Sequence, residues 1–278
     1  MKVMITGAKG MLAQAFIKHM PADWNIAAFD KDALDITKRE AVRVAVTAVK
    51  PEVIINCAAY TQVDTCEEAK ARAFSVNGTG PGNMAEAANE AGAYLIHFST
   101  DYVFDGTQHR PYKEEDPIRP INQYGASKWE GESQVRKHLQ KHLIIRTQWL
   151  YGKGGDHFVK TLIDLAAKKK RLKVVDDQVG APTWTEDLSK AAVQLIAEKA
   201  TGTYHVVNGG HCTWYGFASR IAETAALSVE ILPCSTAEFP RPAQRPGYSV
   251  LSTDKAAKVL GHALPPWEGA LERYFHAE

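Results

Sequence analysis

Neither acidic nor basic side chains dominate this sequence: of its 278 residues, 33 are Lys or Arg and 32 are Asp or Glu, giving a formal net charge of +1. This near-equality of positive and negative charge provides no general attraction to nucleic acid or to an anionic membrane surface, and we expect neither partner. No apolar run approaches the length that spans a bilayer. The opening segment, MKVMITGAKG, also lacks the continuous apolar core of a signal peptide. We therefore expect a cytoplasmic protein.

Cysteine is scarce, and its spacing carries no recognisable site. The four cysteines form no CxxC pair and have no metal-finger spacing with histidine; they are Cys57, Cys66, Cys212 and Cys234. This pattern is typical of free thiols in a reducing compartment rather than of a disulfide scaffold. The sequence predicts no metal ligands.

What the chain does have is the composition of a globular protein, with 45% hydrophobic and 23% charged residues. In its first half, short continuous apolar runs alternate with longer amphipathic stretches. Strands that are apolar on both faces are typical of a parallel sheet covered by helices on each side. We predict an α/β fold, a doubly wound parallel sheet (Rossmann), with strands at Lys2–Thr6, Asn25–Phe29, 53–57, 94–98 and 143–147.

Helices are predicted between these strands, and the pattern changes after residue 150. In the helix expected at 37–50, Thr37 and Glu40 have the spacing of a capping box. The later part is less regular and includes a proline-rich loop at 233–246. We predict a dinucleotide-binding domain over residues 1–150, rejoined by parts of 184–208, and a smaller, mixed α/β substrate-binding lobe over 151–278. The remaining helices are expected at 11–20, 69–91, 124–141, 156–170, 186–198, 214–226 and 253–260, with short strands near 174 and 204–207.

Small residues separate the first strand from the first helix, at Gly7, Gly10 and Ala13. Glycine permits a sharp turn and a close approach of the backbone to a pyrophosphate, and the helix N-terminus offers unpaired amides. A plain strand–helix turn could use the same glycines. The strand–turn–helix context favours a dinucleotide site.

Asp30 follows the second strand, where a carboxylate would accept hydrogen bonds from the adenosine ribose. The alternative is an ordinary turn residue in Asp30-Lys31-Asp32. The glycine turn favours the ribose role, while Lys31 and Lys9 could approach the extra phosphate of NADPH. We expect use of both cofactors, with a modest preference for NADPH.

Tyr124 and Lys128 are four residues apart, which places them on one face of a helix. A nearby ammonium favours the ionised phenol, and such a pair could protonate a carbonyl oxygen as a hydride reaches its carbon. The same spacing occurs on ordinary amphipathic helices. Thr100, at the end of the strand at 94–98, would add a hydroxyl at the ligand-binding edge of the sheet, unless it only caps the next segment.

Longer segments carry a resemblance to a known family: MITGAKGMLA, NCAAYTQVD, FSTDYVFDG, NQYGASKWEGE, IIRTQWLYG and DQVGAPT. The chain resembles the extended short-chain dehydrogenase/reductases and, more narrowly, the dTDP-4-dehydrorhamnose reductase family. The resemblance covers nearly the whole chain, and STDYVF and RTxWxYG are its most specific motifs. It implies NAD(P)H-dependent reduction of the C4 keto group of dTDP-4-dehydro-L-rhamnose to dTDP-L-rhamnose, for rhamnose-containing polysaccharides.

The resemblance also implies roles for individual residues. Tyr124 would be the catalytic acid, Lys128 its partner at the nicotinamide ribose, and Thr100 the group that polarises the ketone. The cofactor would be lined by Gly7, Gly10, Met11, Leu12, Asp30, Lys31, Asp35, Ile36, Ala58, Ala59, Tyr60 and Phe98, together with Tyr124 and Lys128. The nucleotide-sugar would contact Thr100, Asp101 and Trp149. Arg241 and Arg245 could bind its diphosphate, or could simply belong to a proline-rich surface loop.

One departure from the family concerns metal. In the family that this chain resembles, dimeric members hold Mg²⁺ at the interface with acidic side chains, one of them from the first helix. This chain has Ala13-Gln14-Ala15-Phe16 there, so Glu186 lacks its companion. We expect no requirement for Mg²⁺ and a monomer or weak homodimer.

Two other functions remain open. The first is a nucleotide-sugar epimerase or dehydratase, although dehydratases of this group follow the threonine with an Asp-Glu pair, and here Tyr102 follows Asp101. The second is a non-catalytic, cofactor-binding regulatory subunit, such as that of methionine adenosyltransferase. The presence of Thr100, Tyr124 and Lys128 argues against it.

Overall fold

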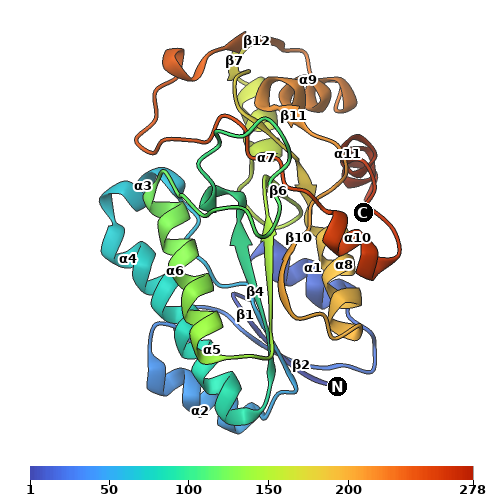
Figure 1. Ribbon diagram of the computed structural model, residues 1–278. Helices are drawn as coiled ribbons and strands as arrows, with labels where there is room; N and C mark the ends of the chain where they lie inside the picture. The colour runs from blue at the N-terminus through green and yellow to red at the C-terminus, as the bar shows by residue number, and fades with distance from the viewer. Residues whose placement is uncertain (278) are drawn as a thin grey trace.

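A six-stranded parallel sheet forms the centre of the computed structural model, which describes residues 1–277 (Figure 1). Its strand order, β10-β5-β4-β3-β1-β2, reverses between β1 and β3, which creates the crevice where doubly wound sheets bind ligands. The predicted doubly wound parallel sheet is therefore confirmed. Its strands are β1 (Lys2–Thr6), β2 (Asn25–Phe29), β3 (Val53–Asn56), β4 (Tyr94–Thr100), β5 (His142–Thr147) and β10 (Gly202–His205).

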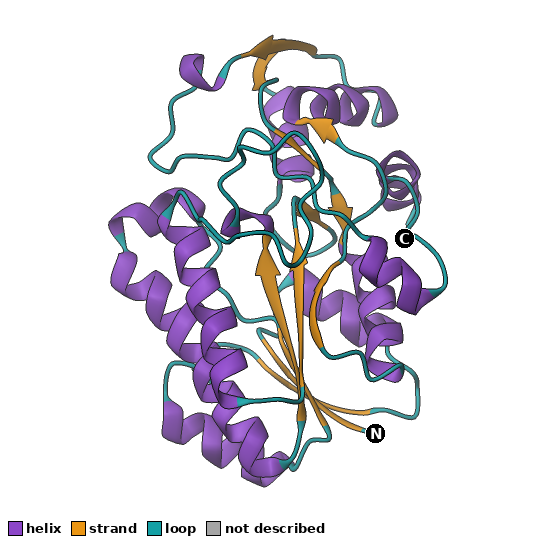
Figure 2. Ribbon diagram, in the orientation of Figure 1, coloured by secondary structure: helices purple, strands orange, loops and turns teal. Residues whose placement is uncertain are grey.

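Helices cover both faces of this sheet (Figure 2). One face packs against α1 (Met11–His19), α8 (Thr185–Ala197) and α10 (Asp254–Leu260). The other packs against α2 (Arg39–Val49), α5 (Gly80–Ala91) and α6 (Gln123–His138). Every residue of β3 is buried, as the continuous apolar run predicts for a strand covered on both sides.

The helical stretch before β4 is more broken than predicted. In place of one helix over 69–91, the chain forms α3 (Val63–Glu68), α4 (Lys70–Phe74), a π-helical turn η1 (Ser75–Thr79) and then α5. The π-turn exposes the amide of Asn77 to two partners: Asn77 accepts from the backbone N–H of Tyr60 at 2.8 Å and donates to Ser127 Oγ at 3.0 Å. The irregular turn thus fixes the loop after β3 against α6.

The predicted capping box at Thr37 is wrong. Helix α2 begins at Arg39, after an N-cap at Lys38 without a side-chain hydrogen bond. The Thr37 hydroxyl donates instead to Asp35 Oδ1 at 2.8 Å, and the Glu40 carboxylate pairs with Arg43. A carboxylate two residues earlier in the chain competes for the hydroxyl that the capping box needs.

The rest of the chain forms a smaller lobe above the carboxyl ends of the strands (Figure 1). Its core is aromatic, with Tyr151, Trp184, Phe217 and Trp267 buried together. Pro233, predicted in a loop, lies in β12 instead, because a two-stranded sheet leaves edge positions that need no N–H donor. The elements are β6 (Leu150–Tyr151), α7 (Phe158–Ala166), β7 (Arg171–Val175), β8 (Val179–Gly180), β9 (Thr183–Trp184), β11 (Cys212–Thr213), α9 (Trp214–Thr224), β12 (Glu230–Cys234) and α11 (Trp267–His276), with short 3-10 turns η2 (Asp101–Val103) and η3 (Thr236–Glu238).

Both α8 and β10 lie within the segment expected to rejoin the first domain, but the division of the chain at residue 150 stays a prediction. Helix α11 was not predicted. The four cysteines are free thiols. Among residues 1–277, no helix is both long enough and apolar enough to cross a membrane.

Candidate active site

The glycine turn after β1 lies at the crevice between β1 and β3. Gly7 has a φ of +72°, and a Cβ on it would lie 2.7 Å from the backbone nitrogen of Ala58, so a larger residue cannot replace it without moving the chain. Gly10 caps α1, and its N–H donates to the Gly7 carbonyl at 2.9 Å. The backbone thereby forms a cradle at a helix N-terminus, which suits the pyrophosphate of a dinucleotide.

A cleft of about 680 Å³ opens beside this turn. Eight of the predicted cofactor residues line it: Gly7, Gly10, Asp30, Lys31, Asp35, Ile36, Ala58 and Ala59. Arg72, Ser75 and Val76 also line it from the irregular helix, and no sequence motif marks that turn as part of a site. The residues present fit a dinucleotide.

Other predicted cofactor residues lie outside this lining. Leu12 and Phe98 are buried in the core beneath the sheet edge, so only their backbone groups could face a ligand. The Arg72 guanidinium lies over the Tyr60 ring, with its central carbon 4.8 Å from the ring centroid. Met11 lies against Gly155 of the smaller lobe. A larger hollow of about 990 Å³ at the opposite edge of the sheet contains none of the predicted site residues.

Both carboxylate oxygens of Asp30 already have partners. Oδ1 accepts hydrogen bonds from the backbone N–H groups of Asp32 and Ala33 at 2.9 Å, and Oδ2 pairs with the Lys9 ammonium. The hydrogen bond from Lys9 lowers the pKa of Asp30. Asp30 therefore does have the role in the turn that the sequence left open. A ribose would share its carboxylate with the Lys9 ammonium, which partly neutralises the charge.

The catalytic candidates meet where β4 ends and α6 begins. Asn122 caps α6 by accepting from the Gly125 N–H at 2.7 Å. A Cβ on Gly125 would lie 2.0 Å from the Tyr102 carbonyl, so the glycine lets α6 approach the turn that follows Thr100. This contact brings the Tyr124 phenol close to the Thr100 hydroxyl. The structure thus brings two of the three predicted catalytic groups together.

The expected effect of Lys128 on Tyr124 is wrong. The Lys128 ammonium donates to the carbonyl oxygen of Phe98 at 2.5 Å rather than facing the phenol. Burial, followed by the charge of Asp101, raises the pKa of Tyr124 well above its usual range, although the hydrogen bond with Thr100 opposes this. Burial also lowers the pKa of Lys128 to about 8. Tyr124 therefore keeps its proton at neutral pH.

Thr100 both caps the next turn and contacts Asp101. Its Oγ1 accepts from the Tyr102 N–H at 3.2 Å and donates to Asp101 Oδ1 at 2.9 Å. Burial raises the pKa of Asp101 to about 7. Nearby, Thr147 Oγ1 on β5 and Gln148 Nε2 just after it are buried and have no hydrogen-bond partner within residues 1–277. Such orphaned polar atoms are typical of a site that receives a polar ligand.

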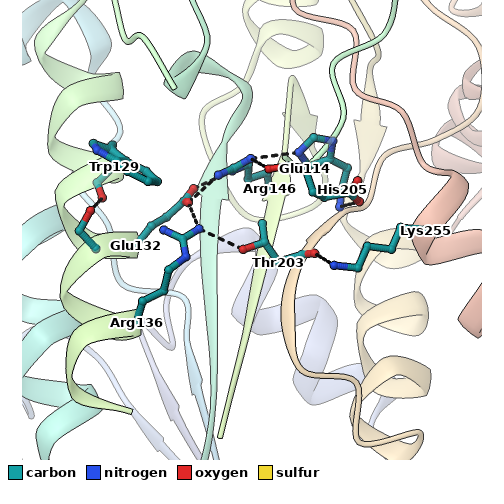
Figure 3. Close-up of polar contacts among 9 residues, drawn as sticks. Glu114, Trp129, Glu132, Arg136, Arg146, Thr203, His205 and Lys255 are labelled. Carbon is teal, nitrogen blue, oxygen red and sulfur yellow. Dashed lines mark hydrogen bonds and ion pairs between the residues drawn. The ribbon is translucent and has the colours of Figure 1, made fainter. Parts of the chain in front are cut away.

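A buried ionic network holds α6 against the sheet (Figure 3). The Glu132 carboxylate accepts from Arg146 of β5 at 2.9 and 2.8 Å and from Arg136 at 2.6 Å. Arg136 also donates to the Thr203 hydroxyl of β10 at 3.0 Å, and Arg146 lies 3.3 Å from the His205 ring. Burial lowers the pKa of His205 to about 3, so this ring is neutral and adds no further charge.

The remaining predicted substrate residues lie toward the smaller lobe. Trp149 follows β5 and stacks on Trp214 of α9. Arg241 and Arg245 both pair with the Asp64 carboxylate of α3. Although burial opposes it, the hydrogen bonds from these arginines hold the pKa of Asp64 well below its usual range. A diphosphate would therefore compete with Asp64 for both arginines. No sequence pattern indicates that these arginines pair with Asp64.

Comparison with known proteins identifies the family. The model of the RmlD substrate binding domain matches residues 1–278. The chain belongs to this family. The resemblance to dTDP-4-dehydrorhamnose reductases stated from the motifs is thereby confirmed, together with the oxidoreductase class that it implies.

Solved and curated relatives of this RmlD-family chain cover almost its full length. A dTDP-4-dehydrorhamnose reductase structure from Clostridium acetobutylicum is 43% identical, with a TM-score of 0.97 and 99% of each chain covered. Another from Bacillus anthracis, in complex with NADP, is 42% identical, with a TM-score of 0.97 and coverage of 100% of this chain and 99% of that one. The spore coat polysaccharide biosynthesis protein SpsK of Bacillus subtilis is 40% identical over 98% of this chain and 96% of its own.

Glu186 is the acidic residue for which the resemblance implied a metal role in dimeric members. In this RmlD-family chain its carboxylate contacts side chains of α1. One carboxylate oxygen of Glu186 of α8 pairs with the Lys18 ammonium of α1 at 2.6 Å, and the other lies 3.2 Å from His19 Nε2. Across the described part of the chain, no group of three or more His, Cys, Asp or Glu side chains is arranged to hold a metal ion.

Proposed function

We propose that this protein uses NADPH to reduce the C4 keto group of dTDP-4-dehydro-L-rhamnose, giving dTDP-L-rhamnose for polysaccharide synthesis. The observation that carries the proposal is the proximity of the Tyr124 phenol to the buried Thr100 hydroxyl at the ligand-binding edge of the sheet. The relatives named as dTDP-4-dehydrorhamnose reductases support the substrate, and the NADP complex of one of them supports the cofactor.

The dinucleotide would lie over the glycine turn in the cleft lined by Asp30 and Ile36, and when bound it would supply the hydride. Tyr124 donates its proton to the ketone oxygen, which it can do because burial keeps the phenol protonated at neutral pH. Thr100 binds the same oxygen through its hydroxyl once that group turns from Asp101 toward the substrate. Lys128, held by the Phe98 carbonyl, binds the nicotinamide ribose.

The nucleotide-sugar would occupy the space between the sheet edge and the smaller lobe. Asp101 and Trp149 would contact it directly, since a buried carboxyl and a half-buried indole lie there. Arg241 and Arg245 would take up the diphosphate when it replaces Asp64. In this proposal the cofactor binds residues 1–150, rejoined by parts of 184–208. The lobe of residues 151–278 provides the diphosphate contacts, while Thr100, Asp101 and Trp149 contact the substrate from the first domain.

NADPH is the preferred cofactor in this proposal, and NADH is also used. The Lys9 ammonium offsets the charge of Asp30, which alone would repel the extra phosphate of NADPH. Lys31 and Arg72 line the same cleft and add positive charge. A cytoplasmic location, a monomer or weak homodimer, and activity without Mg²⁺ remain predictions.

The alternatives have less support. A dehydratase would need an acid in place of Tyr102, whose ring instead lies edge-on against Tyr124 with centroids 5.9 Å apart. A regulatory subunit would not require the Tyr124 phenol to keep its contact with Thr100.

The test is to mix the protein with NADPH and dTDP-4-dehydro-L-rhamnose and to follow the loss of NADPH absorbance. The product is then identified against dTDP-L-rhamnose. Absence of turnover, or formation of a different sugar, contradicts the proposal. NADPH binding without turnover would favour the regulatory subunit.

A further inference from the structure

Trp149 adopts a backbone conformation that bulky residues rarely occupy. Its φ is +46°, in the left-handed region that favours glycine. The strained residue follows the end of β5, where Thr147 is the register partner of the catalytic residue Thr100. Backbone strain of this kind persists only when the surrounding structure enforces it, and it concentrates at ligand sites.

Trp214 of α9 packs against the Trp149 indole. The two indoles stack with centroids 3.6 Å apart and planes 12° from parallel. On its other side Trp214 meets Phe158 of α7, with centroids 4.6 Å apart. Gly180 leaves room for the edge of the Trp149 ring, because a Cβ there would lie 2.6 Å from Trp149 Cε2. The lobe thus holds one tryptophan rigidly against another at the edge of the sheet.

We propose that Trp214 is a positioning residue for substrate binding, which holds the Trp149 indole where it contacts the nucleotide-sugar. The proposal rests on the proposed function, which places Trp149 at the substrate. Trp214 is the first residue of α9, and the Thr213 hydroxyl caps this helix by accepting from the Gly216 N–H at 3.0 Å. The anchored helix start fixes the ring on which Trp149 stacks.

Without the stacked ring, the Trp149 backbone would relax toward ordinary dihedral angles and the indole would leave the site. The catalytic groups Tyr124 and Thr100 do not contact Trp214. Loss of Trp214 should therefore weaken substrate binding more than it slows the chemical step.

The lobe offers a matched control in Trp267. This tryptophan is buried in the aromatic core against which Trp214 packs, but it meets Phe217 edge-on, with centroids 5.7 Å apart and planes at 90°, and it does not stack on Trp149. Trp267→Phe therefore disturbs the same core without removing the stacked pair.

The kinetic experiment compares the parent with Trp214→Ala, Trp214→Phe and Trp267→Phe. We expect Trp214→Ala to raise the KM for dTDP-4-dehydro-L-rhamnose about 10-fold, with kcat and the KM for NADPH changed by less than about 3-fold. Trp214→Phe should restore part of the affinity, and Trp267→Phe should leave the KM near that of the parent. An unchanged KM in Trp214→Ala, or an equal rise in Trp267→Phe, overturns the proposal.

A spectroscopic experiment keeps the proposal testable if Trp214→Ala does not fold. Closely stacked indoles give a coupled pair of bands in far-ultraviolet circular dichroism, which Trp214→Phe should abolish. Titrating the parent with dTDP-L-rhamnose should perturb these bands at the concentration that inhibits the enzyme. Turnover with unperturbed bands overturns the proposal but not the function, whereas perturbed bands without turnover contradict the function and leave the positioning role intact.

Discussion

Glu132 accepts two parallel hydrogen bonds from the guanidinium of Arg146, at 2.9 and 2.8 Å, in the fully buried space between α6 and β5 (Figure 3). Glu132 is one helical turn beyond Lys128 and two beyond Tyr124, so all three share a face of α6. Although burial alone would raise it, Arg146 lowers the pKa of Glu132 to about 2. The ion pair therefore anchors the helix that carries the catalytic phenol.

We predict that Glu132→Gln destabilises the protein by about 3–5 kcal/mol, because it leaves the buried Arg146 without its counter-ion. The double variant Glu132→Leu/Arg146→Met should be closer to the parent, since it removes both charges. Urea unfolding of each variant measures the difference. The control is Glu40→Gln, which breaks the exposed pair with Arg43 and should leave the free energy of unfolding nearly unchanged. Equal effects of Glu132→Gln and Glu40→Gln would contradict this account.

The strands were predictable because their signal is local. A continuous apolar run such as VIIN predicts a strand buried on both faces, and the glycine turn predicts the helix that follows β1. The Tyr124–Lys128 spacing likewise predicts one helix face. Each of these inferences needs only neighbouring residues and the period of the element.

The remaining features depend on contacts between distant segments. Nothing in the run LIIRT shows that Arg146 will be fully buried, because its partner Glu132 belongs to a helix. The π-turn is stabilised by Asn77, which contacts a loop and a second helix. The Lys128 ammonium was expected at Tyr124, but a strand carbonyl binds it first. Tertiary partners, rather than the local pattern, decided these positions.

Tyr124→Phe should lower kcat by about 10²–10⁴-fold, since it removes the proton donor and nothing else from the site. NADPH binding, measured by the fluorescence of the reduced cofactor, should stay close to that of the parent. Tyr112→Phe is the matched control, because Tyr112 is buried away from the site and its hydroxyl donates to Asp105 at 2.9 Å. Near-normal turnover in Tyr124→Phe would remove this residue from its role.

Asp101 should make stability fall as the pH rises toward neutrality. Its folded pKa of about 7 lies above the unfolded value, so folding favours the protonated form. The stabilisation is complete below pH 4 and is lost progressively up to about pH 7. Asp101→Asn, which cannot ionise, should therefore be more stable than the parent at pH 8, by about 1–3 kcal/mol, and closer to it at pH 5.

Thermal unfolding of the parent and Asp101→Asn at pH 5 and pH 8 measures this difference. Asp105→Asn provides the opposite case, because hydrogen bonds from Thr107 and Tyr112, against the effect of burial, lower the pKa of Asp105. That variant should be less stable than the parent at pH 8. A gain from Asp101→Asn that is the same at both pH values would show that Asp101 is already ionised at pH 5.

Chelation of divalent metal should leave the activity unchanged. The two carboxylate oxygens of Glu186 contact Lys18 and His19 of α1, and that helix carries no acidic side chain, whereas Mg²⁺ requires oxygen ligands. The measurement is turnover, with molar mass by light scattering, before and after dialysis against EDTA. Glu186→Gln should likewise retain activity. Loss of activity in EDTA that Mg²⁺ restores, accompanied by the same loss in Glu186→Gln, would establish a metal site at this helix pair.

Cofactor choice should depend on salt, because the charges around Asp30 nearly balance. Lys9 pairs with Asp30 and lies 3.5 Å from Asp32, while Lys31 forms no ion pair within residues 1–277 and lines the cleft. An exposed cation gains little from a phosphate in water, so we predict that NADPH is preferred over NADH by less than about 5-fold at low salt. Raising the ionic strength should reduce the preference, since exposed charges are screened. Lys31→Ala should reduce the NADPH preference at low salt. Lys38→Ala, which removes an exposed lysine outside the cleft lining, should not.

The measurement is kcat/KM for both cofactors at two salt concentrations in the parent and in these two variants. Strict use of NADH, or an NADPH preference that neither salt nor Lys31→Ala changes, would mean that contacts other than these charges select the cofactor.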